Sequence, residues 1–228
     1  MREQFKAQMS QLNDTLIAEA RAAAKAMERA ATALADANLS KAEKVIDADK
    51  RIDVLERAID EMGVSLLARQ NPVAGDLRIV VSGLRLSSTL ERMGDLARHV
   101  AYVARGRYPQ TVVTGGVMEL LLKMAEHAQI AGEKMARLIE TADLTLAHEI
   151  EAEDDLLDDL HLQTFDYVLD EKNEYTRQEV IDIVLLGRYL ERYGDHAVSV
   201  ARRMQYMVQG LNEVRDPFAQ TDLTEVAE

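Results

Sequence analysis

The chain repeats one charged motif, and this repeat limits the possible folds more than any other feature. The segment LERMGDLARHVA begins at Leu90, and the similar segment LERYGDHAVSVARR begins at Leu190, 100 residues later. A second match relates DKRIDVL, which begins at Asp49, to DDLLDDL, which begins at Asp154. Self-similarity at this period indicates two copies of one structural unit, each near the usual size of a small domain.

The hydrophobic pattern is helical throughout. Apolar residues recur at steps of three and four, as in the stripe Ile52, Leu55, Ile59, Met62 and Leu66. Val, Ile and Thr do not alternate with polar residues for long enough to indicate a strand. Proline breaks helix interiors, so Pro72, Pro109 and Pro217 mark connections or ends. The pattern predicts six helices, at residues 3–36, 39–70, 75–106, 115–141, 144–171 and 175–210.

These two observations predict the architecture. We expect an all-α protein of two tandem, pseudo-symmetric three-helix bundles, built from six long helices. The N-terminal bundle is expected at residues 1–107 and the C-terminal bundle at residues 115–210. Residues 211–228 are acidic and contain Pro217, which predicts a disordered tail.

The charge and composition exclude several classes of protein. The formal net charge is −13, and a surface this negative repels the phosphates of nucleic acids, so no direct nucleic-acid binding is expected. The chain has no cysteine, which excludes disulfides and thiolate metal sites and fits a cytoplasmic location. The longest uncharged stretch, Tyr108 to Met118, is far shorter than the roughly 20 apolar residues of a spanning helix, so no membrane insertion is expected.

Acidic residues gather at matching places in the two halves. Glu91 and Asp95 lie one turn apart on the third predicted helix, away from its apolar stripe, and they recur as Glu191 and Asp195. Like charges at this spacing weaken a helix, and the glycine between them weakens it further. Because both unfavourable features occur twice, the pattern favours a function over a requirement of helix stability.

The second helix of each half supplies a further acidic pair. Helices two and three of a bundle pack antiparallel, so the carboxylate pairs can face one another. Converging carboxylates suit a hard cation such as Mg²⁺, Mn²⁺ or Ca²⁺, and an added imidazole makes iron or zinc possible. The predicted metal ligands are Asp49, Asp53, Glu91, Asp95, Asp154, Asp158, Glu191 and Asp195. The alternative interpretation is that these acids only solvate a helix face.

The remaining polar residues show no catalytic pattern. The chain has no glycine-rich phosphate loop, no HExxH and no GxSxG, so no enzymatic activity is expected. His99 and His196 lie beside the acidic pairs, but the repeat has Ser199 and Leu96 in their places, so neither is expected to bind metal. We interpret His127 and His148 as surface residues. Arg78, Arg85 and Arg92 recur every seven residues and form a basic edge, which we interpret as solvated; the alternatives are that it steadies the carboxylates or contacts a partner.

The repeated motifs resemble those of the PhoU family of phosphate-transport accessory regulators. That family is marked by a Glu/Asp-x-x-x-Asp motif used twice in a tandem three-helix-bundle protein. The resemblance rests on LERMGDLARHVA, LERYGDHAVSVARR, DKRIDVLERAI and DDLLDDL, and it covers about residues 1–210. NPVAGDLR also resembles the linker of the family, whereas the second half departs there with KNEYTRQEV, so the two sites need not be equivalent.

The resemblance implies a non-enzymatic regulator that acts at the inner face of the cell membrane through partners. It implies negative regulation of the phosphate-starvation response and modulation of phosphate uptake. The implied partners are the ATPase subunit of a phosphate ABC transporter, a phosphate-sensing histidine kinase and a second copy in a homodimer. It also implies divalent or trivalent metal ions (iron, zinc, manganese or magnesium) on the eight acidic residues. A metal-dependent enzyme, a metal-storage protein and a purely structural helical oligomer are the alternatives.

Overall fold

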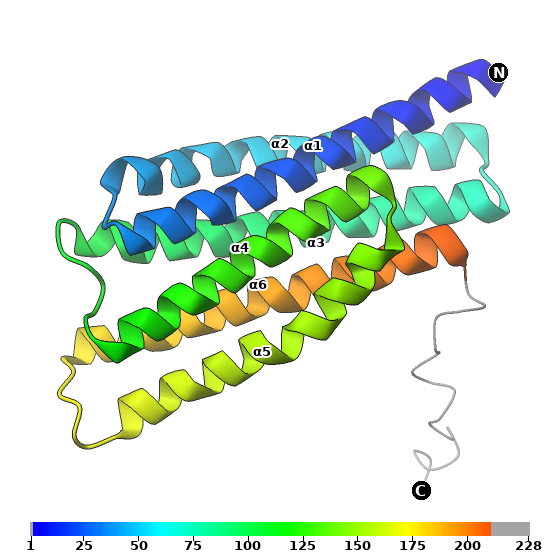
Figure 1. Cartoon of the computed structure of the whole chain (residues 1–228). Helices are drawn as coiled ribbons and strands as arrows, with labels where there is room; N and C mark the ends of the chain where they lie inside the picture. The colour runs from blue at the N-terminus through cyan, green and yellow to red at the C-terminus, as the bar shows by residue number, and fades with distance from the viewer. Residues whose placement is uncertain (1, 211–228) are drawn as a thin grey trace, which may run out of the picture.

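Six helices make up the computed structural model, which describes residues 2–210 (Figure 1). They are α1 (Arg2–Ala35), α2 (Leu39–Gln70), α3 (Ala74–Arg107), α4 (Gly116–Thr141), α5 (Leu144–Leu169) and α6 (Arg177–Gln209). Every expected helix is confirmed, with ends within two residues of the prediction, and residues 2–210 contain no strand. The tail expected at residues 211–228 lies outside the described residues.

Polar side chains cap the start of three of the described helices, α2, α5 and α6. Asn38 precedes α2, and its side-chain oxygen accepts a hydrogen bond from the backbone N–H of Lys41 at 3.0 Å. Thr176 and Glu179 form a capping box at the start of α6, in which each side chain binds the backbone of the other. Such caps satisfy N–H groups that have no partner within the helix. The short connections that result place consecutive helices antiparallel within each half.

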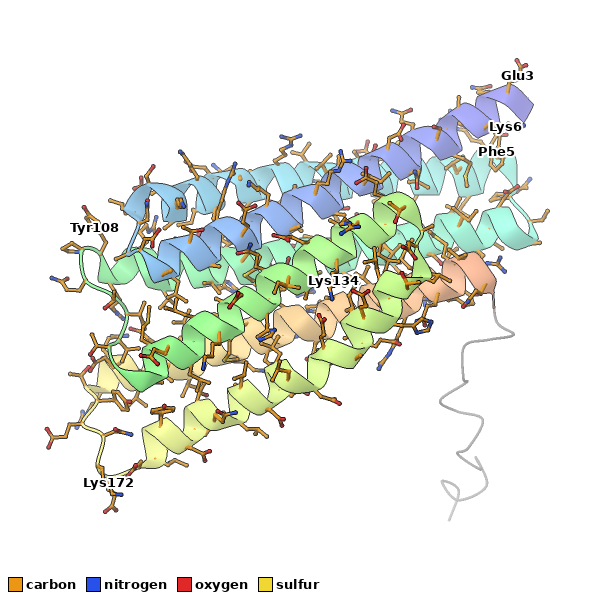
Figure 2. The ribbon with its side chains drawn as sticks, viewed as in Figure 1. Glu3, Phe5, Lys6, Tyr108, Lys134 and Lys172 are labelled. Carbon is orange, nitrogen blue, oxygen red and sulfur yellow. The ribbon has the colours of Figure 1, made fainter. Side chains whose placement is uncertain are left out.

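The two halves pack against each other through four of the six helices. α1, α2 and α3 contact one another, as do α4, α5 and α6, while α1 lies beside α4 and α3 beside α6 (Figure 1). α2 and α5 are therefore the outer helices. Tyr108 and Lys172, in the α3–α4 and α5–α6 connections, lie at the end of the molecule opposite Glu3 (Figure 2). The all-α class with two tandem three-helix units is confirmed, whereas the boundaries 1–107 and 115–210 stay a prediction.

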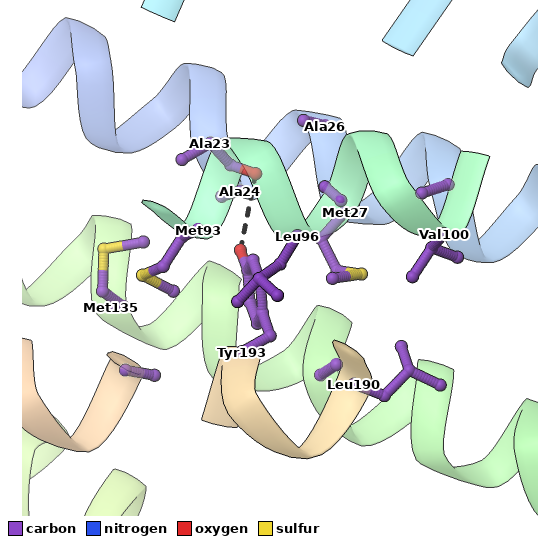
Figure 3. Packing of buried hydrophobic residues seen from close by; sticks show 14 of the residues in the cluster. Ala23, Ala24, Ala26, Met27, Met93, Leu96, Val100, Met135, Leu190 and Tyr193 are labelled. Carbon is purple, nitrogen blue, oxygen red and sulfur yellow. Dashed lines mark hydrogen bonds between the residues drawn. The ribbon is translucent and has the colours of Figure 1, made fainter. Parts of the chain in front are cut away.

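A single apolar core runs through both halves. Its buried residues come from all six helices. Tyr193 on α6 is fully buried, and its hydroxyl donates a hydrogen bond to the carbonyl oxygen of Ala23 on α1 at 3.4 Å (Figure 3). Met27, Met93 and Leu96 are buried in the same cluster and lie near the tyrosine side chain (Figure 3). Because burying one such side chain stabilises a fold by about 1.5–3 kcal/mol, this shared core joins the halves firmly.

The motif glycines allow two pairs of helices to approach closely. A Cβ added at Gly94 would lie 2.7 Å from the Cδ1 atom of Ile52, and one added at Gly194 would lie 2.6 Å from the Cδ2 atom of Leu157. Real Cβ atoms do not sit this close to a neighbour. The glycines therefore have a packing role, which the sequence interpretation attributed to function alone. Their close contact brings the acids of α2 toward those of α3, and those of α5 toward those of α6.

Candidate functional site

The eight predicted ligands form two clusters, each between an outer helix and its inner neighbour. The first cluster joins α2 and α3 and consists of Asp49, Asp53, Glu91 and Asp95. The second cluster joins α5 and α6 and consists of Asp154, Asp158, Glu191 and Asp195. Since α3 lies beside α6, the two clusters flank this central helix pair on either side.

The second cluster brings three carboxylates within reach of one cation. Asp158, Glu191 and Asp195 each offer an oxygen, and these oxygens lie within 4.8 Å of one another. Arg188 holds Glu191 in place, with 2.6 Å between its Nη1 atom and the Oε1 atom of the carboxylate. Oxygen ligands at this spacing suit a hard divalent cation.

Charge repulsion and burial shift the pKa values of this cluster. The pKa of Asp154 is raised to about 6, first by burial and then by the charges of Asp158 and Asp195. The pKa of Glu191 is raised as well, first by burial and then by Asp195. Both shifts mean that the negative charges are unfavourable without a counter-ion. A bound cation would remove the repulsion, so the donor set of the second cluster fits a metal ion.

An arginine takes the place of a cation in the first cluster. Arg98 on α3 forms ion pairs with Asp49 on α2 and with Asp95 on its own helix, the second at 2.6 Å. Asp49 is only 4% exposed, and burial raises its pKa while Arg98 opposes that shift. Burial and the charge of Asp95 also raise the pKa of Glu91. Within residues 2–210, the first cluster contains no three acids that meet around one point as in the second. It therefore fits a metal only if Arg98 moves away.

The difference between the clusters follows from one position of the repeat. Arg98 corresponds to Val198, which is buried and carries no charge. The second cluster consequently has no internal arginine between its α5 and α6 acids, although Arg188 contacts Glu191 from the side. The sequence contains this signal, because the segments GDLARH and GDHAVS differ there.

Two histidines lie near the second cluster. The helical spacing from Asp154 and Asp158 already places His161 on their face of the helix, whereas the sequence does not place His127 here. His127 on α4 and Asp154 line a cavity of about 20 Å³, which has room for one water molecule. His161 lies on α5, one turn beyond Asp158, and its Nε2 atom is buried without a hydrogen-bond partner. Burial and the charge of Arg188 lower the pKa of His161, which favours the neutral form that binds metals. His127 was expected at the surface, and only the packing of α4 on α5 brings it here.

The two histidines of the repeated motif have other surroundings. His99 stacks on Tyr189, with 5.0 Å between the ring centroids. His196 lies near Arg92 and Arg192, and its pKa is lowered by burial and then by these arginines. Neither belongs to the group of residues that can hold a cation in the second cluster.

No helix within the described part of the chain is long and apolar enough to cross a membrane.

A family model of the PhoU domain matches the chain twice, over residues 16–104 and 121–204, and each match contains one complete acidic cluster. The chain is 38% identical to the phosphate-specific transport system accessory protein PhoU homolog 2 of Mycobacterium tuberculosis over 210 residues, which is 92% of this chain and 99% of that protein. It is 31% identical to the Pseudomonas aeruginosa homolog over 213 residues, 91% of this chain and 86% of the relative.

Solved structures have the same fold. The crystal structure of PhoU from Pseudomonas aeruginosa superposes with a TM-score of 0.80 at 28% identity, covering 91% of this chain and 100% of that one. The phosphate transport system regulatory protein PhoU from Streptococcus pneumoniae gives a TM-score of 0.79 at 22% identity, covering 91% and 98%. With two matches to the family model and relatives above 30% identity over most of its length, the chain belongs to the PhoU family.

Proposed function

We propose that this protein is a regulatory accessory protein of a phosphate transport system. It restrains the phosphate-starvation response when phosphate is plentiful, and it modulates phosphate uptake. The main support is its similarity to a phosphate-specific transport system accessory protein along 99% of that relative's length. The role is non-enzymatic, in keeping with a sequence that has none of the common catalytic motifs.

The protein acts as an adaptor between two partners. One is the ATPase subunit of a phosphate ABC transporter, and the other is a phosphate-sensing histidine kinase. The net charge of −13 disfavours direct binding to an anionic membrane, so the chain reaches the inner face of the membrane through these proteins. Two similar three-helix units offer two similar surfaces, which suits a homodimer that contacts a two-subunit ATPase.

Metal ions belong to the second part of the proposal. The ligands are the eight acids of the two clusters, and the ion is iron, zinc, manganese or magnesium. A bound cation neutralises the carboxylates and draws together the helices that carry them. In the second cluster, Asp158 on α5 and Asp195 on α6 supply oxygens from the two helices, while Arg188 keeps Glu191 oriented.

A pull-down with purified transporter ATPase and histidine kinase tests the adaptor role. Wild-type protein should capture both. Glu91→Ala with Asp95→Ala, and Glu191→Ala with Asp195→Ala, should each leave a folded helical protein that captures less of at least one partner. Glu43→Ala with Asp47→Ala is the matched control, because these exposed acids have the same spacing on α2 and lie outside both clusters.

A phosphate-starvation reporter in a strain without the endogenous protein extends the test to cells. The quadruple cluster variant should leave the reporter active in high phosphate, whereas wild type and the control should silence it. Full repression by the quadruple variant at normal protein level would exclude the clusters as the working site. Failure of wild type to capture either partner would contradict the adaptor role, and turnover of a phosphate ester would contradict the non-enzymatic one.

A further inference from the structure

The central helix pair carries a line of arginines that begins between the two acidic clusters and runs toward the start of α3. Arg78, Arg85 and Arg92 lie on α3, at intervals of seven residues, and Arg192 and Arg203 lie on the neighbouring α6. We name these five residues the arginine seam. Among residues 2–210, none of the five forms an ion pair. Arg98, in the first cluster, does have carboxylate partners, and exposed arginines elsewhere on the molecule also lack one, so what distinguishes the seam is that its arginines lie close to one another.

The fold holds these like charges close together. α3 and α6 run antiparallel, since Arg78 donates to the carbonyl oxygen of Met207 at 3.3 Å while Arg107, at the other end of α3, pairs with Asp182. Arg85 consequently comes close to Arg203, whose pKa is lowered first by burial and then by this neighbour. Arg92 approaches α6 in the same way, next to His196.

Cations gathered without ion-pair partners oppose folding through their mutual repulsion. A feature that reduces stability in this manner is expected where it has a binding role. A ligand of these residues is expected to be negatively charged, because guanidinium groups are always positively charged and donate hydrogen bonds without accepting any.

The length of the seam indicates the class of anion. Arg78 and Arg92 are 14 residues apart on one helix, which corresponds to about 21 Å. One small oxyanion can contact only neighbouring guanidinium groups at hydrogen-bond distances of about 2.9 Å. A polypeptide with several carboxylates can contact the whole line, as acidic motifs do with arginine clusters.

We propose that the arginine seam is the docking surface for an acidic peptide segment of a partner protein. This inference names the surface and the partner chemistry for the adaptor role and in that sense rests on the proposed function. The flanking clusters set a condition on docking. Glu91 and Glu191 precede the seam residues Arg92 and Arg192 in the sequence. The carboxylates of the clusters repel an acidic peptide until cations neutralise them. Metal loading then switches the central face from mixed charge to positive charge.

Fluorescence anisotropy with a labelled 16-residue Glu/Ala peptide tests the docking surface directly. The host is the full-length variant Glu91→Gln, Asp95→Asn, Glu191→Gln and Asp195→Asn, in which the flanking charge is removed without metal. We expect this variant to bind the peptide, with an affinity that falls as salt rises. Adding Arg85→Glu and Arg203→Glu should weaken binding at least tenfold. Arg51→Glu with Arg137→Glu, the same charge change at exposed sites on α2 and α4, should weaken it less than threefold.

Four results would overturn the proposal. The first is equal weakening by the seam and control substitutions in variants with matching circular dichroism and melting temperatures. A milder pair, Arg85→Gln with Arg203→Gln, gives an intermediate loss if the seam binds and none if it does not. The second is displacement of the peptide by inorganic phosphate at equal concentration of negative charge, which would assign the seam to a small anion.

The third and fourth contrary results concern other parts or copies of this chain. Residues 211–228 contain five acids, and Gly210, which precedes them, lies next to Arg78. If the peptide binds only after these five acids are neutralised in the full-length chain, the seam belongs to the chain's own C-terminal segment. If peptide binding is lost as the protein dimerises with rising concentration, the seam belongs to a second copy. Because the assay needs neither metal nor natural partner, peptide binding together with a failed pull-down would reject the adaptor role and retain the seam.

Discussion

Arg98 forms an ion pair with the buried carboxylate of Asp49, at the place where a metal ion would join α2 to α3. The guanidinium also contacts Asp95, so its single positive charge is shared between two of the four acids in the first cluster. Arg98 therefore offsets part of the negative charge of the first cluster, whereas the second cluster, with Val198 at the corresponding position, has no such arginine between its helices. The two sites should differ in cation affinity.

The substitution Arg98→Val places in the first half the residue that the second half has at the corresponding position, Val198. Without metal, Asp49 loses its counter-ion and the protein should lose about 2–3 kcal/mol of stability, because an unpaired buried carboxylate is costly. With Mn²⁺, the variant should recover stability and bind the ion more tightly at the first cluster. Isothermal titration calorimetry and urea denaturation measure the two effects. Arg105→Val, an exposed arginine on the same helix, is the control, and unchanged Mn²⁺ affinity in Arg98→Val would contradict the expectation.

The second cluster should account for most metal-dependent stability in the wild type. A cation that binds only the folded state at a concentration of 100 times its Kd adds about 2.7 kcal/mol. Asp158→Asn with Asp195→Asn should abolish most of the rise in melting temperature that Mn²⁺ produces, and EDTA should have no further effect on this variant. The matched variant of the first cluster, Asp53→Asn with Asp95→Asn, should retain the response. A response that is equal in both variants would place the stabilising ion elsewhere.

Glu19 makes stability depend on pH near neutrality. This α1 residue is buried without a hydrogen-bond partner, and burial, followed by the charges of Glu56 and Glu91, raises its pKa to about 8 despite the nearby Ser87 hydroxyl. The folded state keeps the proton up to about pH 8, whereas the unfolded chain releases it near pH 4.5. The stabilisation is thus complete at low pH and is lost as pH rises through this window.

As pH rises from 5 to 8, deprotonation of Glu19 should lower the free energy of unfolding by up to about 4 kcal/mol. Glu19→Gln removes the titrating group and should flatten the curve measured by urea denaturation, with higher stability at pH 8. Glu61→Gln, at an exposed site on α2, should leave the slope as in wild type. Parallel curves for Glu19→Gln and wild type would show that Glu19 keeps an ordinary pKa.

The ion pair between Arg107 and Asp182 should stabilise the contact between the two halves. Asp182 is only 4% exposed, and its Oδ2 atom lies 2.5 Å from the Nε atom of Arg107. Arg107→Met leaves this carboxylate without a counter-ion and should cost about 2–3 kcal/mol, while adding Asp182→Asn should restore part of the loss. The exposed pair Arg21–Glu140 also joins the halves, but Arg21→Ala should cost less than about 1 kcal/mol. Equal costs in chemical denaturation would contradict this ranking.

The repeat made the fold and the acidic clusters predictable, because duplicated spacing is visible in the sequence. Which helices pack against each other between the two halves was harder to predict from the sequence. α1 does carry a signal, since Ala20, Ala23, Ala24 and Met27 are buried on a wider arc than one neighbour requires. Such an arc indicates contact on two sides but does not identify the partner helix.

Contacts between side chains on different helices were even harder to predict from the sequence. The pairing of Arg98 with Asp49 depends on rotamers and on the distance between α2 and α3, which the pattern of residue types does not specify. His127 reaches Asp154 only through the packing of α4 on α5. The absence of charge at Val198 was visible in the repeat, and it remains the clearest sequence sign that the clusters differ.

The covalent joining of the two halves has a consequence for how the protein responds to metal. In a homodimer of one three-helix unit, symmetry would copy every substitution into both sites. In a tandem chain, Arg98 alters one site and leaves the other unchanged. One rigid body can thus combine a tight site with a weak one. If both clusters bind metal as proposed, occupancy should rise in two steps, over a wider range of cation concentration than two identical sites could cover.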